Sequence, residues 1–544
     1  MLKNKDMQLS IYSVLYNKIP KNHTLKILRD EVDFSFINKR LEQTYCKRYG
    51  RPAKEPELMV KLLVLQYLYD LSDVRVIEEA SLNLAYMYFL DINPEDELPH
   101  PSLLTKFRKD KLEGNLTMDE IMAETIHQCV DKEILEGSGI SIDTTHTEAN
   151  TFKCTAERVM KRFAHQIFKT MEEENGEVPE DIDTDIPNYK EIENHKEAKA
   201  VMGSYLEEVL DNSEKHIDIE NCPKTKDLLD NARNVLADPK FMEQKGVRSL
   251  VDQDARVGHK SKTSHFFGYK TEFMITTEDR MITAVNVDHG AYVDGTKFDE
   301  LLEMTKKSGV AIKEVYGDKA YFKKPILDKI KETGAKPYIP VSEMAYKIDE
   351  DLYSYNKDSD EWFCVQGNKT VRKYHKKGKK RESYRYYFDK ETCRDCPIRD
   401  VCISGKTVGR ILEVGVNTPE FYEYSQQQKT DEFKEKYKNR SCQEWKNGEM
   451  KNFHGLDRAR GYGLKSMALQ AKLTAFAVNL KRIAAILSSK KMSFFNFNLV
   501  ISKNISQKGK LKKIDVSCQK TPPKKSPFSV VSTCPYVPIN SNSI

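Results

Sequence analysis

Apolar residues recur at three- and four-residue steps in the first part of the chain, a spacing typical of helices that bury one face. Leu58, Leu62, Leu65 and Leu68 form the clearest stripe, which neighbouring apolar residues widen. We therefore expect a helical N-terminal domain over residues 1–130, built from several helices joined by tight turns.

Serines stand at two positions in this region where a helix is expected to begin. Ser72 and Ser102 each precede a short helical pattern, and serine side chains cap the free amides at helix starts. The helix from Ser102 carries the cations Lys106, Arg108, Lys109 and Lys111. Such a segment can lie against DNA, as in helix-turn-helix modules. The alternative is that these cations form the solvated face of an ordinary packed helix. This segment by itself favours that alternative.

The middle of the chain switches to short runs of β-branched and aromatic residues, which predict strands. Two of these runs are separated by a short polar turn and form an expected hairpin. Helical patterns alternate with the later runs, so we expect an α/β fold in which helices cover a mixed sheet. The predicted strands are residues 139–145, 265–276, 281–287, 311–316 and 335–341, and the predicted helices are 297–307 and 323–333.

Two insertions and a basic tail interrupt this pattern. Residues of about 156–245 are charged and helical, and Glu172–Asp185 contains eight acids and no base, so we expect a solvated, mobile excursion there. Residues 346–410 are basic, rich in tyrosine and bear cysteines. Helical patterns return over residues 430–487, within the segment 411–489. The tail of 490–544, with ten lysines against one acid, is expected to be mostly disordered.

Composition narrows the class of protein. Hydrophobic residues make up 39% of the 544 residues and charged residues 31%, which excludes fibrous and wholly disordered chains. No apolar run approaches the roughly 18 residues that a membrane span needs, and the amino end lacks the apolar core of a secretion signal. The eleven cysteines are an odd number. We therefore expect a cytoplasmic protein with reduced thiols and no membrane partner.

One helical segment near the carboxyl end aligns four chemically active side chains. At about 100° per residue, Tyr437, Arg440, Glu444 and Lys451 fall within an arc of about 60° on one helix face. Glu449, the other acid on this segment, points elsewhere. A carboxylate flanked by two cations and a phenol on one face is more specific than the charge pairs of an ordinary surface helix.

The spacing of these four residues resembles the Y-x2-R-x3-E-x6-K signature of bacterial insertion-sequence transposases of the DDE class. RARGYGL from Arg458 and AVNLKRI from Ala477 resemble the family's carboxyl-terminal helices, and DQDARVGHKSKTSHFFGYK from Asp252 resembles an early catalytic-domain motif. GRPAKEPELMVKLLVLQ and HPSLLTKFRK are similar to the family's InsH-type N-terminal domain. The resemblance covers about residues 20–487.

The resemblance implies an RNase H-like catalytic domain, with a mixed five-stranded sheet in which the first strand lies beside the fourth and parallel to it. Asp143, on the first strand, then matches the first acid, and Asp318, just past the fourth strand, matches the second. Asp288 is the main competitor for the second acid, but it follows the third strand. Glu444 supplies the third acid.

Three carboxylates suit phosphodiester chemistry. Two Mg²⁺ or Mn²⁺ ions can activate the attacking oxygen and stabilise the leaving one, and such hard cations prefer oxygen ligands. The resemblance implies that Asp143 bridges both ions, with one further acid on each. Arg440 and Lys451 are then expected to hold phosphate or orient the glutamate, and Tyr437 to bond the DNA backbone. His146 is expected to face the other side of the strand as an ordinary polar residue.

The cysteines of the 346–410 insertion form a second group. Cys364, Cys393, Cys396 and Cys402 have the number and type of ligands for a tetrahedral structural Zn²⁺ site, although their spacing is irregular. Reduced thiols that pack a small subdomain explain the same residues. Similar cysteines in this branch of the family keep the zinc interpretation open, and the sequence alone does not choose.

A basic run lies beside these cysteines. Lys369–Arg385 contains nine lysines and arginines against one acid, interleaved with tyrosines. Cations follow phosphates and aromatic rings stack on bases, so we expect this segment to clamp DNA through Lys373, Lys376 and Lys377. A solvated charge run is the alternative. Arg108 is the corresponding DNA-binding prediction in the N-terminal domain.

These features predict a DNA transposase that cleaves the terminal inverted repeats of its own element and joins the freed 3′-hydroxyl to target DNA. The predicted partners are double-stranded DNA and a second copy in a synaptic homodimer. Two alternatives are a transposase-derived DNA-binding protein without cleavage and an RNase H-like nuclease without strand transfer. The predicted domains are residues 1–130, 131–345 with the insertion of about 156–245, 346–410, 411–489 and 490–544.

Overall fold

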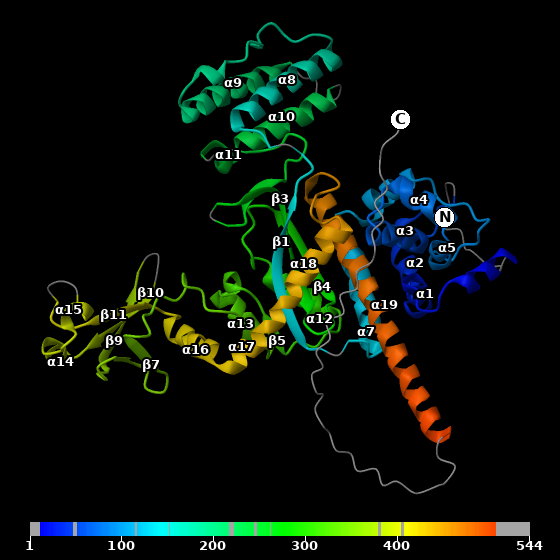
Figure 1. Cartoon of the computed structure of the whole chain (residues 1–544). Helices are drawn as coiled ribbons and strands as arrows, with labels where there is room; N and C mark the ends of the chain where they lie inside the picture. Colours follow the sequence, from blue (N-terminus) through cyan, green and yellow to red (C-terminus); the bar gives the residue numbers. More distant parts are fainter. Residues whose placement is uncertain are drawn as a thin grey trace, which may run out of the picture. The chain divides into compact units, whose positions relative to one another are not determined.

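The structure is a computed structural model, and it describes residues 11–46, 52–114, 117–135, 137–151, 153–216, 222–243, 247–261, 263–378, 382–403 and 407–506 (Figure 1). The chain divides into two units, residues 1–489 and 490–544. All residues predicted above to serve in catalysis, DNA binding or metal binding lie in the first unit. None of the helices in these ranges has the length and apolarity needed to cross a bilayer.

The N-terminal region is helical, as predicted, and packs around a central helix. α3(Pro56–Leu68) is buried on nearly every face rather than along one stripe, because shorter helices surround it. The other elements of this region are η1(Ile11–Lys18), α1(Thr24–Glu31), α2(Phe36–Leu41), η2(Glu42–Thr44), α4(Asp73–Leu82), α5(Leu84–Phe89), α6(Ser102–Phe107), η3(Arg108–Leu112) and α7(Thr117–Asp131).

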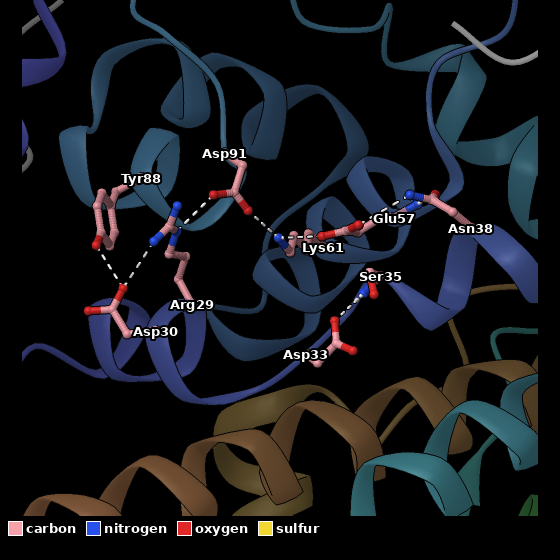
Figure 2. A network of polar contacts seen from close by, with 9 residues as sticks. All are labelled: Arg29, Asp30, Asp33, Ser35, Asn38, Glu57, Lys61, Tyr88 and Asp91. Carbon is pink, nitrogen blue, oxygen red and sulfur yellow. Dashed lines mark hydrogen bonds and ion pairs between the residues drawn. The ribbon is translucent and has the colours of Figure 1, made fainter. Parts of the chain in front are cut away.

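α3 can bury a lysine because two carboxylates meet its ammonium group (Figure 2). Nζ of Lys61 lies 2.8 Å from Glu57 Oε1 and 2.5 Å from Asp91 Oδ2. Arg29 Nε donates to the other carboxylate oxygen of Asp91 at 2.8 Å. A buried charge without partners would be costly. The network therefore ties α1 and α3 to the turn that follows α5.

One of the two predicted serine caps is confirmed. The hydroxyl of Ser72 accepts a hydrogen bond from the Arg75 amide at 3.2 Å at the start of α4. The prediction for Ser102 is wrong, because Pro101 takes the cap position and Ser102 is the first residue of α6. Its hydroxyl instead lies 2.8 Å from His100 Nδ1.

The central sheet places the first and fourth predicted strands side by side and parallel, as expected. In chain order the strands are β1(Gly139–Glu148), β2(Arg256–His259), β3(His265–Thr276), β4(Ile282–His289), β5(Glu314–Tyr316) and β6(Lys336–Tyr338). β1 is antiparallel to β3 and parallel to β5, β4 is antiparallel to β3, and β6 is parallel to β5. Five strands therefore run in the order β4, β3, β1, β5, β6.

The sheet has six strands in the described residues, one more than the five expected. β3 is long enough to pair with two strands along the same edge, so that Tyr269–Ile275 pair with β4 and His265–Gly268 pair with β2. The predicted hairpin of β3 and β4 is confirmed. The short β2 only extends the edge and leaves the neighbours of β1 unchanged.

Alternation along β1 divides its side chains between two layers. Ile140 and Ile142 join the hydrophobic cluster formed with α12(Phe298–Lys307) and α13(Lys324–Glu332). Ser141 and Asp143 therefore face the opposite side, where α18(Ser441–His454) runs beside β1 (Figure 1).

The first insertion is a helical unit with its own core. Phe163, Leu206 and Leu229 are buried in it. The acidic stretch expected to be a solvated excursion packs here, because Ile182 is buried and the Tyr205 hydroxyl donates to the Asp183 carbonyl at 2.8 Å. The elements are α8(Ala156–Asn175), η4(Tyr189–Glu191), α9(His195–Lys215), α10(Pro223–Leu236) and α11(Pro239–Glu243).

The second insertion packs two small sheets around Trp362, Tyr386 and Phe388. β9(Thr370–Lys377), β10(Glu382–Phe388) and β11(Ile411–Gly415) form one antiparallel sheet, and β7(Tyr353–Asn356) and β8(Glu361–Cys364) form the other. Two short helices, α14(Lys390–Arg394) and α15(Arg399–Cys402), and the turn between them carry three of the cysteines. The predicted basic run, Lys369–Arg385, includes β9 and the first part of β10, which pair as a hairpin, called the basic hairpin below.

The carboxyl-terminal helices are broken where the sequence suggested one continuous helix. α16(Thr418–Lys429) and α17(Asp431–Tyr437) come first, and a 3₁₀ turn, η6(Lys438–Arg440), then separates α17 from α18. A further 3₁₀ turn, η5(Lys319–Tyr321), follows β5 in the central sheet. The last helix, α19(Gly463–Ser506), continues past residue 490, so the segment expected to be disordered begins in a helix. Residues 507–544 lie outside the described residues.

Candidate active site

Hydrogen bonds from side chains to backbone carbonyls hold α18 and the residues that follow it against β1. The Gln443 side chain is fully buried, and its Nε2 donates to the Ser141 carbonyl at 2.7 Å. Further along, the Thr147 hydroxyl donates to the Leu456 carbonyl at 2.8 Å. Glu444 directly follows Gln443, so the register of the helix on the strand determines where this carboxylate lies.

Asp143 is the buried acid of the site. Its side chain is 15% exposed, with Arg440 Nη2 at 3.6 Å and Asn447 Nδ2 at 3.5 Å from Oδ2. Burial raises the pKa of Asp143 to about 6, against the opposing charge of Arg440, and repulsion from Asp318 and Asp294 adds to the rise. The carboxylate therefore lies where its negative charge is poorly compensated.

Asp318 lies at the same level of the sheet. Ser141 pairs with Tyr316 across the parallel strands β1 and β5, and each acid is two residues further along its own strand direction. Oδ1 of Asp318 accepts from the Ala320 amide at 2.8 Å, which turns the chain into η5. The charge of Asp318 raises the pKa of Asp143, so the two carboxylates act on each other.

Glu444 approaches from the helix. Its side chain is 70% exposed, and Oε1 lies 3.5 Å from Arg440 Nη1. Burial lowers the pKa of Arg440, but Asp143, Asp318 and Glu444 all raise it, and the net pKa is raised. The charges of all three predicted acids thus act on one guanidinium group. In the described part of the chain, no three His, Cys, Asp or Glu side chains are close enough together to hold a metal ion as a group.

The other residues of the signature divide between two places. Tyr437 stacks on Phe433, and its pKa is raised by burial and, against Arg440, by the charges of the three acids. Lys451 instead lies beside His146, with Nζ 3.3 Å from Nδ1. Burial and Lys260 lower the pKa of Lys451 to about 8, and burial and Lys451 lower that of His146 to about 4. Both groups therefore belong to the far end of β1.

The two competing acids have partners elsewhere. Asp288 lies on the edge strand β4, with Oδ2 3.5 Å from Lys297 Nζ. Glu449 lies 2.8 Å from both Lys446 Nζ and Lys481 Nζ, on the side of α18 that meets α19. Neither acid is among the charges that act on Asp143.

A buried carboxylate that was not predicted from the sequence lies behind the site. Glu272 is fully buried in β3 and accepts from the hydroxyls of Tyr292 at 2.7 Å and Tyr321 at 2.8 Å. The Tyr321 hydroxyl also lies 2.9 Å from that of Thr144, the residue after Asp143. Burial raises the pKa of Glu272. An acid within the apolar run HFFGYKTEFMIT was the available signal.

The predicted DNA-binding cations differ in their surroundings. The guanidinium group of Arg108 pairs with Asp73 at 2.5 Å and donates to Gln66 at 3.0 Å. This residue therefore joins α3, α4 and η3, and the prediction that it faces DNA is not supported by its contacts. Sequence analysis missed the role because Asp73 and Gln66 are distant in the chain.

The cations of the basic hairpin are more exposed to solvent than Arg108. Lys373 pairs with Asp360 at 2.6 Å and lies over the Tyr384 ring at 3.8 Å, and Lys376 pairs with Glu413 at 3.1 Å. Lys377 lies at the end of β9 and is exposed.

The four predicted cysteine ligands line one small cavity of about 20 Å³. Cys364, Cys393, Cys396 and Cys402 are free thiols of intermediate burial. Cys402 Sγ lies 3.3 Å from the Tyr353 hydroxyl. The fold therefore gathers the four thiols, although they do not form a ligand set at bonding distance.

Comparison with protein families defines the class of protein. Residues 13–110 match a transposase domain (DUF772), and residues 363–484 match a transposase DDE domain. The chain is therefore a DNA transposase. Both matches are transposase domains, one of them a DDE domain, which agrees with the resemblance to insertion-sequence transposases.

Curated proteins and solved structures give no further support for the class of protein. No curated protein matches the sequence. Among solved structures, a piggyBac transposase synaptic complex with hairpin DNA matches at 11% identity over 88% of this chain and 77% of that chain, with a TM-score of 0.28. This similarity is too low to define a shared fold.

Proposed function

We propose that this transposase cleaves DNA at the ends of its mobile element and joins the freed 3′-hydroxyl to target DNA, with Asp143, Asp318 and Glu444 as its catalytic carboxylates. One observation carries the proposal: three acids from distant stretches of the chain act on a single guanidinium group, that of Arg440. A phosphodiester that replaces the acids as the partner of Arg440 would leave them free for chemistry.

We infer that the catalytic domain is RNase H-like. The strand order β4, β3, β1, β5, β6, with β1, β5 and β6 parallel, supports this assignment. The domain would comprise residues 131–345 and about 416–489, with the two insertions between its elements, and residues 1–130 would form the N-terminal DNA-binding domain. The predicted boundary at residue 411 is too early, because β11 pairs with β10 in the second insertion.

The donors at the site fit Mg²⁺ or Mn²⁺, because they are carboxylate oxygens. Asn447 Oδ1, beside Asp143, is buried without a hydrogen-bond partner and adds a neutral amide oxygen, which is also a hard ligand. When bound, two such ions would supply an activated attacking oxygen and stabilise the leaving oxygen. Asp143, Asp318 and Glu444 would hold them.

The chain's own cations would position the DNA. The Nη atoms of Arg440 lie 3.6 Å from Asp143 and 3.5 Å from Glu444, so the guanidinium group makes no close ion pair that a phosphate oxygen would have to replace. Tyr437, held by its stacking on Phe433, would bond the backbone beside it. Lys451 would contact phosphate further along β1.

We propose two roles for the second insertion. Its basic hairpin, with Lys373, Lys376 and Lys377, would follow DNA phosphates near the site. Its four cysteines suit Zn²⁺ by ligand type and by their shared cavity, and would bind one structural ion after small movements of the thiols. Double-stranded DNA is thus the principal partner, and pairing two element ends calls for a homodimer.

The test is incubation of the purified protein with Mg²⁺ and duplex DNA that carries the terminal inverted repeat, with the products resolved on a denaturing gel. Asp143→Asn, Asp318→Asn and Glu444→Gln should each abolish cleavage and retain binding to the repeat. Asp288→Asn and Glu435→Gln are matched controls and should cleave normally, because Asp288 lies on a different strand and Glu435 is an exposed acid of α17 that pairs with Lys438. Normal cleavage by any of the three variants removes that residue from the centre. Cutting without strand joining would favour a nuclease, and binding without cutting an inactive DNA-binding protein.

A further inference from the structure

An exposed tryptophan directly follows Glu444 on the outer face of α18. Trp445 is 65% exposed, whereas Trp362, the other tryptophan of the chain, is fully buried. The Arg280 guanidinium group, from the turn between β3 and β4, lies 4.5 Å from the centroid of the Trp445 ring. Because Arg280 covers only part of the indole, a broad aromatic surface stays open to solvent.

Cations surround this ring. A hollow of about 250 Å³ is lined by Arg280, Trp445, Lys446, Glu449, Lys481, Arg482 and Ala485. Its one carboxylate, Glu449, is already paired with Lys446 and Lys481. The four cations therefore outnumber the single acid, and the hollow favours an anionic ligand.

The position on the helix connects this hollow with the proposed chemistry. Glu444 and Trp445 are both exposed, whereas the residues before and after them, Gln443 and Lys446, are buried. Trp445 is therefore the exposed aromatic side chain next to Glu444 in the chain, close enough to contact a DNA strand bound at Glu444.

We propose that Trp445 is a stacking platform for a nucleobase of the DNA strand beside the scissile phosphate, and that Arg280, Lys481 and Arg482 meet the backbone of the same strand. The proposal rests on the proposed function, because it takes Glu444 as the point of cleavage. Aromatic rings among cations bind single-stranded nucleic acid in this way, because every base has a π-face and every linkage a negative charge. An apolar partner surface would leave the excess positive charge of the hollow uncompensated.

The two tryptophans make the test direct. The full-length protein, in EDTA to prevent cleavage, is titrated with a duplex that carries the terminal inverted repeat and ends at the cleavage site. Stacking on Trp445 should quench tryptophan emission, and Trp445→Phe, whose emission comes from buried Trp362 alone, should show no quench while it binds with nearly normal affinity. Trp445→Ala should bind about 5- to 150-fold more weakly, the range expected for one lost base stack.

Control variants separate base stacking from a structural role of the tryptophan. Phe453, on the same helix, is 66% exposed, and Phe453→Ala should keep both the quench and the affinity. Trp445→Ala should melt at the normal temperature, because the side chain is largely exposed. Lys481→Gln should reduce the salt dependence of binding, whereas Trp445→Ala should not.

Two results would overturn the proposal: normal affinity of Trp445→Ala together with no quench in the unaltered protein, or a change of oligomeric state in Trp445→Ala, which would make this face an interface between copies. Failure of the proposed function gives a different result, since Asp143→Asn would then cleave normally whether or not Trp445 is quenched.

Discussion

Replacing Asp143 by asparagine should stabilise the metal-free protein at neutral pH. Folding raises the pKa of Asp143 from 3.8 to about 6, and its side chain is only 15% exposed. The folded protein then binds the proton more tightly than the unfolded chain, so stability falls as pH rises from about 4 to above 6. Two pKa units correspond to roughly 3 kcal/mol, an upper estimate of the gain that asparagine provides at pH 7.5.

The assay is thermal or urea unfolding of both proteins in EDTA between pH 4 and pH 8. Asp143→Asn should be the more stable at pH 7.5, and the difference should largely disappear near pH 4, where the acid is protonated in the folded state and roughly half protonated in the unfolded chain. Mg²⁺ should stabilise the unaltered protein at pH 7.5 and have little effect on the variant, because a ligand that binds only the folded state stabilises it. Equal or lower stability of the variant at pH 7.5, with the same pH dependence, would refute the reasoning.

Three further predictions address other parts of the chain. Gly448→Ala should stabilise α18 by about 0.5–1 kcal/mol in unfolding experiments, because the nearest atom to an added Cβ, Asn452 Nδ2, is 4.0 Å away; a loss of stability would show that the glycine is required. Lys61→Met should cost about 1–3 kcal/mol in the same assay, because Glu57 and Asp91 lose their shared ammonium group; an unchanged stability would mean that the network contributes nothing. Elemental analysis should find close to one zinc per chain, lost in Cys393→Ser; no zinc in the unaltered protein would leave the thiols as packing residues.

The position of the two aspartates could be predicted from sequence because it depends on one topological fact. Once strands 139–145 and 311–316 are taken as parallel neighbours, acids at their ends must lie close together. The register of Ser141 on Tyr316 bears this out. Glu444 could be selected by its spacing to Arg440, since i and i+4 positions share a helix face.

Other features depend on contacts between residues far apart in the chain. The helical wheel treated Tyr437 to Lys451 as one helix, whereas η6 interrupts it and Lys451 lies beside His146 instead of the acids. Arg108 has the charge of a DNA contact, but Asp73 lies beside it and pairs with it. A cation in the sequence can belong to an internal ion pair or to a binding surface. Only the folded structure shows which, because the paired acid lies far away in the chain.

Gln443 offers a test of whether α18 must be held in register for catalysis. Its amide donates to the Ser141 carbonyl at 2.7 Å, and its own Oε1 is buried without a partner. Gln443→Met keeps the volume and removes both the bond and the unpaired oxygen, so the net loss of stability should be small, about 1 kcal/mol. Glu444 follows directly, and a displacement of about 1 Å can cost on the order of 100-fold in rate. We therefore expect cleavage to slow by about tenfold or more while the affinity for DNA stays normal. If Gln443→Met cleaves at the normal rate, α18 keeps its position by apolar packing, and the bond to β1 has no part in placing the third carboxylate.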